Sequence, residues 1–265
     1  MARPRPSCSV SMMFREDSIL ERFGAARAAG FQGVEIQVVE EGDPAAMAIA
    51  ARDAGVDVVL INVDMGDLRT GGAGLSGVPG REAEFRAAVT RALDASLTLG
   101  AGRIHLGPSR VPAGVSRTEC LAVYRANLAW AVEQAAGHPA TLLVEPLNVI
   151  ENPTILLSDF GEAVQLIREC RSERLGLQFD IYHAAMNGVD IRQAFRDHLS
   201  FVRHIQFADA PGRHEPGTGG VDFAAAFAEI AASSYAGWAG AEYVPATTTA
   251  ASFTWRQSLD EYFSP

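Results

Sequence analysis

Four polar residues in the second half of the chain end or follow short apolar runs. They are Glu145, Asp180, Gln206 and Glu242. An ionised carboxylate at the end of an apolar strand is costly unless it is paired or metal-bound, and three converging carboxylates repel one another. A divalent cation between them removes this repulsion, and oxygen ligands of this kind favour Mg²⁺ or Mn²⁺ over zinc. The pattern therefore predicts a metal site made of these four side chains.

Each of these residues has a simpler explanation when it is considered alone. Glu145 and Glu242 could form salt bridges with arginines, and Asp180 could cap a following helix. Polar residues commonly end strands and cap helices, so one such residue carries little information. Four of them at equivalent positions is a much rarer coincidence, which favours the metal site.

Two histidines lie close to these residues in the sequence. His183 follows Asp180 by three residues and is predicted to touch the substrate or a metal-bound water, with an ordinary surface histidine as the alternative. His204 shares a strand face with Gln206, because side chains alternate along a strand with a period of two. We expect His204 just below the metal, or else in the core.

Four further residues are candidate substrate contacts. Arg213 and His214 lie in a predicted loop and could bind a substrate carboxylate, which a guanidinium contacts through two parallel hydrogen bonds. The alternative for both is a solvated loop position. Glu35 and His105 occur in predicted strands and could line the same pocket, although a core position is the better explanation for His105.

Short apolar, β-branched runs alternate with longer amphipathic stretches, a pattern typical of repeated βα units. Strands are predicted over Cys8–Met12, Gly33–Val38, Asp57–Asn62, Arg103–Leu106, Ala140–Glu145, Leu175–Asp180, Val202–Phe207 and Trp238–Tyr243. The clearest helices are predicted over Asp17–Ala29, Arg81–Leu99, Arg117–Ala136, Asp159–Glu169 and Phe253–Tyr262. Ser158 is the predicted cap of the fourth of these helices.

This order of elements predicts an α/β fold, a single (β/α)8 barrel domain over residues 1–265. A barrel brings the carboxyl ends of all its strands to one face, so the four candidate ligands would converge there. A doubly wound sheet is the alternative, but GxGxxG is absent after the first predicted strand. Two glycine-containing loops, Gly66–Gly80 and Asp209–Gly220, could form active-site lids, with mobile surface loops as the alternative.

The composition excludes several classes of protein. All 22 basic residues are arginine, so Schiff-base chemistry and a P-loop lysine are excluded. The net charge of −10 makes nucleic acid an unsuitable partner. Cys8, Cys120 and Cys170 lack CxxC spacing, and we expect buried thiols rather than disulfides or zinc ligands. Because neither a membrane-length apolar run nor a signal-like start is found, we expect a cytoplasmic protein without membrane contact.

Several motifs around these residues are specific enough to suggest a family. They are Ser11–Phe14, Gly74–Glu82, Val144–Asn148, Gln178–His183, His204–Gln206 and Gly212–Gly219. Together they resemble the hydroxypyruvate isomerase family, within the wider xylose-isomerase-like barrel superfamily that also contains 2-oxo-tetronate isomerases and ketose 3-epimerases. The resemblance covers nearly the whole chain.

The resemblance implies an activity and roles for particular residues. In that family the residues matching Glu145, Asp180, Gln206 and Glu242 bind a divalent metal, and the two glutamates transfer the proton. This implies a metal-dependent isomerase of small α-hydroxycarbonyl compounds, such as hydroxypyruvate, tartronate semialdehyde or 2-oxo-tetronates, acting through a cis-enediolate. A ketose 3-epimerase and a metal-dependent dehydratase or lyase are the alternatives. The family often forms dimers or larger assemblies, so a homo-oligomer is also an expectation.

Three departures from the family pattern concern the substrate. The segment Glu35–Glu41 stands where relatives carry aromatic and proline residues, Ser9 stands where asparagine is common, and Gly220 replaces a frequent acidic residue. We expect a changed pocket wall and unchanged metal chemistry. An apurinic-site endonuclease of the same superfamily would need a histidine-rich zinc cluster and a basic groove, which six histidines and a net charge of −10 disfavour. A non-catalytic sugar-binding protein would be expected to lack a metal ligand.

Overall fold

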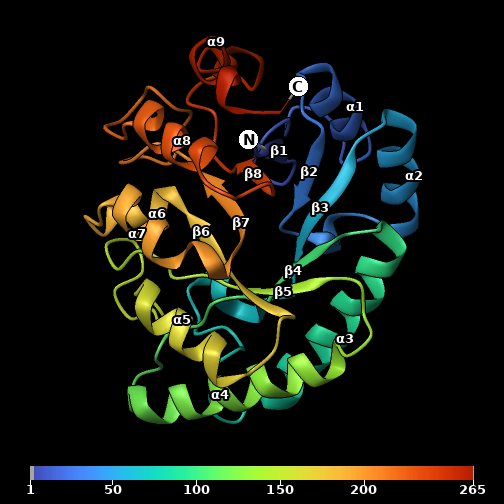
Figure 1. Cartoon of the computed structure of the whole chain (residues 1–265). Helices are drawn as coiled ribbons and strands as arrows, with labels where there is room; N and C mark the ends of the chain where they lie inside the picture. Colours follow the sequence, from blue (N-terminus) through green and yellow to red (C-terminus); the bar gives the residue numbers. More distant parts are fainter. Residues whose placement is uncertain (1–2, 265) are drawn as a thin grey trace.

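Parallel strands pair side by side in chain order and close into a barrel (Figure 1). The computed structural model describes residues 3–264, and the eight strands in this range include a closing pair between the first and the last. The strands are β1 (Arg5–Ser9), β2 (Gly33–Ile36), β3 (Asp57–Asn62), β4 (Arg103–His105), β5 (Thr141–Val144), β6 (Leu175–Asp180), β7 (Val202–Phe207) and β8 (Trp238–Ala241). The predicted (β/α)8 barrel is confirmed.

The predicted bounds of β3, β6 and β7 agree with the structure, while β1 differs most. β1 was expected to reach Met12 but ends at Ser9, because the backbone N–H groups of Met12 and Met13 fold back onto the Ser9 carbonyl (3.4 and 3.0 Å). This turn carries the next residues over the end of the barrel. β5 and β8 end just before Glu145 and Glu242, so each glutamate is the first residue of the loop that follows its strand.

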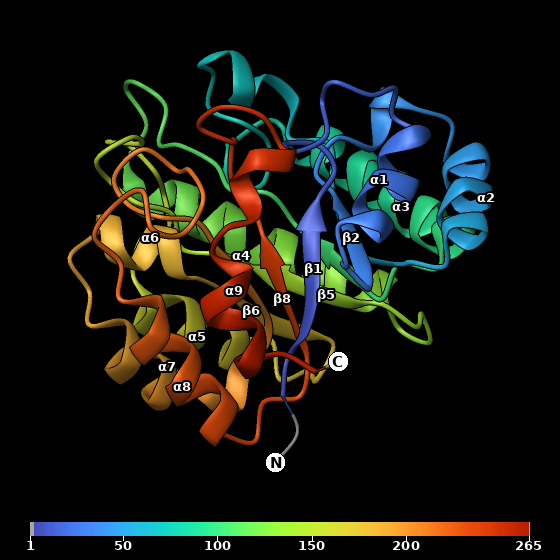
Figure 2. The ribbon, with the colours of Figure 1, turned by 90° about the horizontal axis from the view of Figure 1, so that it is seen from above.

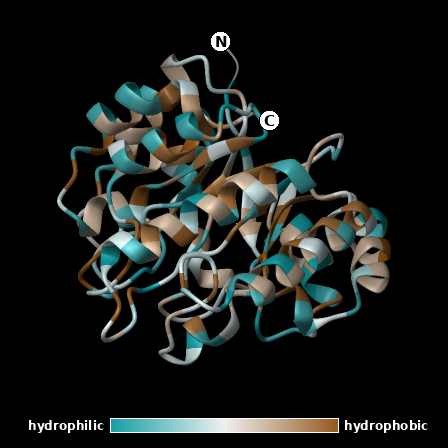
Figure 3. Cartoon of the chain, turned by 90° about the horizontal axis from the view of Figure 1, so that it is seen from below, coloured by the Kyte–Doolittle hydropathy of each residue, from teal (hydrophilic) through white to brown (hydrophobic). Residues whose placement is uncertain are grey.

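Helices surround the barrel and connect its strands (Figures 1 and 2). They are α1 (Glu21–Ala28), α2 (Pro44–Ala54), α3 (Glu82–Leu99), α4 (Arg117–Gln134), α5 (Phe160–Glu169), α6 (Ile181–Met186), α7 (Ile191–His198), α8 (Phe223–Ala232) and α9 (Arg256–Leu259). In Figure 3 the helices carry both hydrophilic and hydrophobic segments, as expected when one face packs on the barrel and the other meets water.

Side-chain caps determine where several helices begin. Ser116 and Glu119 form a reciprocal capping box at α4, in which each side chain accepts a hydrogen bond from the other's backbone N–H. The cap of α5 is Asp159, whose carboxylate accepts from Glu162 N (2.8 Å), and the prediction of Ser158 was therefore wrong by one residue. The predicted final helix is instead divided into a short α9 between two 3₁₀ turns.

Two features of the composition can be followed in the structure, the state of the cysteines and the hydropathy of the helices. Cys8 and Cys120 are buried, Cys170 is half-buried, and all three are free thiols. Among residues 3–264, no helix is long and apolar enough to cross a membrane.

Candidate active site

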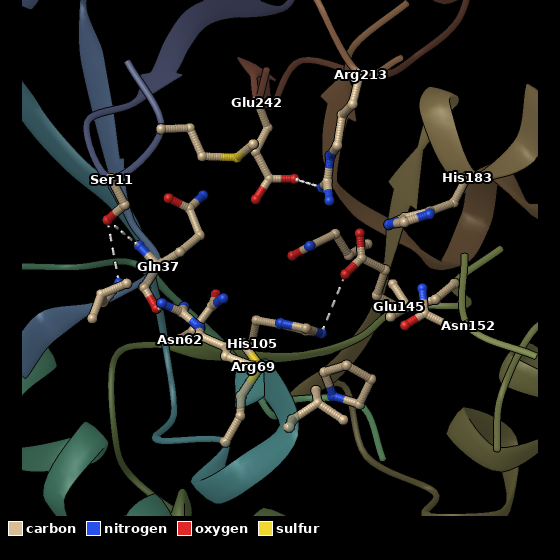
Figure 4. A pocket seen from close by; sticks show the side chains of 17 residues that line it. Ser11, Gln37, Asn62, Arg69, His105, Glu145, Asn152, His183, Arg213 and Glu242 are labelled. Carbon is tan, nitrogen blue, oxygen red and sulfur yellow. Dashed lines mark hydrogen bonds and ion pairs between the residues drawn. The ribbon is translucent and has the colours of Figure 1, made fainter. Parts of the chain in front are cut away.

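A cavity of about 290 Å³ opens at the carboxyl ends of the strands (Figure 4). Glu145 and Glu242 line it from the first residues after β5 and β8, and His105 lines it from the last residue of β4. His183, on α6, and Arg213, in the loop after β7, complete this side of the pocket. The barrel therefore gathers side chains that lie far apart in the sequence, as predicted.

Three buried carboxylates lie together at the acidic side of the pocket, where Glu145 and Glu242 line the cavity and Asp180 lies beside Glu145. Glu145, Asp180 and Glu242 are 6%, 1% and 7% exposed. One oxygen of Asp180 caps α6 by accepting from Tyr182 N (2.8 Å), so the capping alternative is also realised. The other, Oδ2, and Oε1 of Glu145 are buried without a hydrogen-bond donor among the described residues. Buried oxygens of this kind are costly unless a proton or a cation satisfies them, so the donor set fits a divalent metal.

The carboxylates raise one another's pKa values in addition to the effect of burial. Burial, Asp180 and Glu242 raise the pKa of Glu145 well above its usual range. Burial raises the pKa of Glu242 to about 7, and Arg213 opposes this shift. Burial likewise raises the pKa of Asp180 to about 6 against the influence of Arg213. The mutual repulsion inferred from the sequence is therefore present, and a cation would relieve it.

Arg213 is the positive charge that partly compensates these carboxylates. Its Nη2 donates to Glu242 Oε2 (2.6 Å) and lies 3.7 Å from Asp180 Oδ2. The guanidinium carbon also lies 5.1 Å from the centre of the Tyr182 ring. Arg213 lines the pocket as predicted, and its Nη2 is engaged by the protein carboxylates Glu242 and Asp180.

A buried aspartate fixes the loop that carries Arg213. The carboxylate of Asp209 is fully buried and accepts hydrogen bonds from the backbone N–H groups of Gly217 (2.8 Å), Gly219 (2.8 Å) and Val221 (3.0 Å). A Cβ on Gly219 would lie 2.4 Å from the Ala210 carbonyl oxygen, so glycine is required at this close approach. These bonds tie the base of the loop, which was predicted as a candidate lid.

Asp209→Ala is expected to lower the free energy of unfolding by about 2–4 kcal/mol, because several backbone N–H groups of the loop lose a fully buried acceptor. Urea unfolding with comparison of midpoints and m-values measures this change. Asp222→Ala is the matched control, since Asp222 caps α8 through one exposed bond to Ala225 N (3.0 Å). We expect a loss of about 1 kcal/mol there. Equal losses in the two variants would contradict the special role of Asp209.

His183 is oriented so that it donates a hydrogen bond into the pocket. Its Nδ1 accepts from Asn148 N (3.2 Å), so the neutral ring carries its proton on Nε2, which lies 3.6 Å from Asp180 Oδ2. Burial, together with Arg213 and His105, lowers the pKa of His183 well below its usual value. Candidate ligand atoms of Glu145, Asp180 and His183 lie within 4.8 Å of one another. Because Nε2 bears the proton, His183 is placed as a hydrogen-bond donor beside these carboxylates.

His105 is both buried and part of the pocket. Its Nε2 lies 3.5 Å from Glu145 Oε2, and burial followed by the neighbouring His204 lowers the pKa of His105 to about 3. The ring is therefore neutral at physiological pH. The sequence allowed His105 either a pocket-lining or a core position. In the structure both hold, because His105 borders Glu145 from the core side of the pocket.

A hydrogen-bonded layer below the pocket holds Gln206. Glu35 is fully buried and accepts from Ser7 Oγ (2.7 Å), His204 Nε2 (2.9 Å) and Gln206 Nε2 (2.7 Å). Gln206 Oε1, on the other side of the amide, accepts from Gln178 Nε2 (2.6 Å). Because a carboxylate can only accept hydrogen bonds, Glu35 holds the NH₂ group of Gln206 and so turns Gln206 Oε1 away from itself. One lone pair of this oxygen accepts from Gln178, and the second remains for a metal. The expected place of His204, below the site, agrees with this layer.

Two predicted substrate contacts lie elsewhere. Glu35 is enclosed below the pocket by protein donors, so its predicted contact with substrate is not supported. His214 Nδ1 lies 2.7 Å from the Val244 carbonyl oxygen and braces the loop after β8, so it does not line the pocket with Arg213.

The opposite wall of the pocket was missed as a site. It is lined by Ser11, Gln37, Asn62 and Arg69, which lie across from Glu145 and His183 in Figure 4. Two signals were available in the sequence. Asn62 ends β3 in the same way that Asp180 ends β6, and Arg69 is the one basic residue of the glycine-rich segment before Gly80.

Comparison with known proteins finds relatives that are similar over nearly the whole chain. A family model described as xylose isomerase-like TIM barrel matches residues 23–261. A 2-oxo-tetronate isomerase from Cupriavidus necator is 35% identical over 252 residues, covering 95% of this chain and 97% of that protein. The hydroxypyruvate isomerase of Escherichia coli is 34% identical over 258 residues, covering 97% and 99%. A crystal structure described as AP endonuclease, family 2, from Brucella melitensis has a TM-score of 0.90 at 33% identity, covering 96% and 98%.

The closed barrel and its carboxylate-lined pocket define an α/β-barrel protein with a candidate active site at the carboxyl ends of the strands. The chain belongs to the xylose isomerase-like TIM barrel family. Relatives similar over nearly its whole length are named as isomerases of hydroxypyruvate and of 2-oxo-tetronate, which confirms the resemblance predicted from the motifs.

Proposed function

We propose that this protein is a metal-dependent isomerase of small α-hydroxycarbonyl acids, of the hydroxypyruvate or 2-oxo-tetronate type. The reaction would proceed through an enediolate of the substrate, with proton transfer by Glu145 and Glu242. The observation that carries the proposal is that both glutamates are buried in one pocket, beside Asp180, with raised pKa values. The names of the similar relatives support the same reaction class.

Glu145, Asp180, Gln206 and Glu242 would hold the metal, for which Mg²⁺ and Mn²⁺ are the expected ions. A bound divalent cation would polarise the carbonyl and hydroxyl oxygens of the substrate and so acidify the C–H bond between them. The unsatisfied oxygens of Glu145 and Asp180 are the atoms that most need such a partner.

The remaining residues of this side assist proton transfer. A glutamate must be ionised to remove the proton, and Arg213 favours the ionised form of Glu242 through its hydrogen bond at 2.6 Å. The glutamate that has taken up the proton would then return it to the neighbouring carbon, either directly or by way of the opposite glutamate. His183 Nε2–H is placed to donate to a substrate oxygen as negative charge develops there.

Proton NMR in D2O tests the function. Protein stripped of metal and then reloaded with Mg²⁺ or Mn²⁺ would be incubated with hydroxypyruvate, tartronate semialdehyde, 2-oxo-tetronates and small ketoses, with excess paramagnetic ion removed before spectra are recorded. We expect metal-dependent conversion of an acid with deuterium incorporated at carbon. Product identity separates an isomerase from a 3-epimerase, which would act on ketoses, and from a dehydratase, which would release water. Absence of exchange with every acid would contradict the proposal.

Metal binding is expected to strengthen as the pH rises. In the metal-free protein the pKa values of Asp180 and Glu242 are raised to about 6 and about 7. A carboxyl group whose pKa is raised in the folded protein stabilises the fold when it is protonated. This stabilisation is fully present below the unfolded-state pKa of about 4 and is lost as the pH rises through the folded-state pKa. The metal requires ionised carboxylates, so protons compete with it below about pH 7.

Thermal unfolding with and without saturating Mg²⁺ or Mn²⁺ measures this competition. We expect the increase in Tm produced by the metal to be clearly larger at about pH 8 than at about pH 5.5. An increase of the same size at both pH values would show that these carboxylates do not exchange protons for the ion.

The cytoplasmic location and the homo-oligomeric state of this protein stay predictions.

A further inference from the structure

We infer that Arg69, with Ser11 and Asn62, forms the subsite that binds the substrate carboxylate and makes the pocket select acids over neutral ketoses. This inference rests on the proposed function, whose site it completes. It assigns to Arg69 the role that the sequence suggested for Arg213.

The first argument is the balance of charge around the pocket. Glu145, Asp180 and Glu242 carry three negative charges when ionised, and a divalent cation together with Arg213 would balance them. The carboxylate of Glu35, one layer lower, is enclosed by its own donors. The metal side of the pocket thus has no surplus positive charge for an acid.

Arg69 supplies that surplus from the opposite wall. It is the other arginine that lines the cavity, and it lies in the 3₁₀ turn Gly66–Thr70 after β3. Its Nη2 donates to the Gln37 carbonyl oxygen (2.5 Å), which holds the guanidinium against the end of β2. Within residues 3–264, no carboxylate lies within ion-pair distance of Arg69, so its charge stays available to a ligand.

Two neighbouring side chains that line the cavity have unused hydrogen-bonding capacity. Ser11 Oγ accepts from the backbone N–H groups of Gln37 (3.0 Å) and Val38 (3.2 Å), which leaves its own proton to be donated. Asn62 is 7% exposed, and its Oδ1 is buried without a donor among the described residues. In Figure 4 Ser11, Gln37, Asn62 and Arg69 occupy the side of the pocket away from Glu145 and His183.

Together these groups fit a small acid better than a polyol. The guanidinium and the Ser11 hydroxyl donate to a carboxylate, while Asn62 can accept from a hydroxyl group beside it. A cavity of about 290 Å³ suits a chain of few carbons held between this wall and the metal side.

Arg69→Ala tests the inference with ligand pairs in which a carboxylate is replaced by a neutral hydroxymethyl group. Isothermal titration of the Mg²⁺-loaded protein would compare D-glycerate with glycerol, and kinetics would compare hydroxypyruvate with dihydroxyacetone. The variant loses the charged hydrogen bond between the guanidinium and the ligand carboxylate. We therefore expect about 10- to 100-fold weaker glycerate binding and a similar fall in kcat/KM for hydroxypyruvate. Values for the neutral partners should change less than about twofold, and Ser11→Ala should weaken glycerate binding about 2- to 10-fold.

Arg91→Ala is the matched control, because it removes one arginine charge from α3 while the cavity lining stays complete. The Arg91→Ala variant should bind glycerate and glycerol with the affinities of the wild type. The inference is overturned by unchanged glycerate binding in Arg69→Ala, by equal losses in Arg91→Ala, by equal losses for glycerol, or by a wild-type protein that does not prefer glycerate. Failure of the proposed function is distinguishable, since glycerate binding is measured without turnover.

Discussion

Glu145→Gln and Glu242→Gln are each expected to lower kcat by about 100- to 10,000-fold, the range that a positioned general acid or base contributes. Glutamine keeps the size of the side chain and one oxygen, but it can neither remove nor return a proton at neutral pH. Both glutamates are nearly buried, so water has little access to replace them. The NMR assay in D2O measures turnover and carbon-bound deuterium together.

The controls separate lost chemistry from lost structure. Burial and repulsion disfavour the ionised glutamates in the metal-free protein, so neither glutamine should lower its Tm. Glu229→Gln, in a surface pair with Arg196, is the matched variant and should keep wild-type activity. A variant that exchanges deuterium into the substrate without forming product would identify the retained glutamate as the first base. Near-normal turnover in either variant would sink the two-glutamate mechanism.

The strand ends could be predicted because barrel geometry is periodic. Asp180, which ends β6, and Glu145 and Glu242, which follow apolar strands, meet at one face whatever the details of packing. His204 below Gln206 follows from the two-residue alternation in the same way. What the pattern lacks is depth, which is the position of each side chain along the axis of the barrel.

Glu35 shows why depth is missing from the sequence pattern. It stands in β2 in a position that resembles the other strand-end carboxylates, yet its side chain lies in the interior. A Cβ on Gly240 would lie 1.7 Å from Glu35 Oε1, so the space for this carboxylate exists because β8 carries a glycine there. That fit depends on how strands 205 residues apart are aligned around the closed barrel, which no local pattern records.

Loop residues were harder to place for a different reason. Arg213 and His214 are adjacent, yet one points to Glu242 and the other to the Val244 carbonyl. The direction is set by the positive φ of 56° at Arg213 and by the bonds that Asp209 makes within the loop. Arg69 was missed because a glycine-rich segment without periodicity gives no indication of which side chain turns inward.

Glu35→Gln is expected to damage both the fold and the metal site. The carboxylate accepts hydrogen bonds from four donors, the longest from Gln37 Nε2 (3.5 Å), and the amide that replaces it would set an N–H₂ group against at least one of them. Removing one partner from a buried, hydrogen-bonded charge predicts a loss of about 3–5 kcal/mol in the free energy of unfolding. Because Gln206 would lose the contact that orients its amide, we also expect Mn²⁺ affinity to fall about 10- to 100-fold.

Urea unfolding and Mn²⁺ titration followed by electron paramagnetic resonance measure the two effects of Glu35→Gln separately. Ser7→Ala is the informative comparison, because it removes one donor to Glu35 and leaves the bond from Gln206 Nε2 intact. It should cost about 1 kcal/mol of stability and change Mn²⁺ affinity little. If Glu35→Gln destabilises the fold but binds Mn²⁺ as the wild type does, Glu35 only fills the barrel. A fall in affinity confined to Glu35→Gln means instead that the buried carboxylate acts on the metal through the orientation of Gln206.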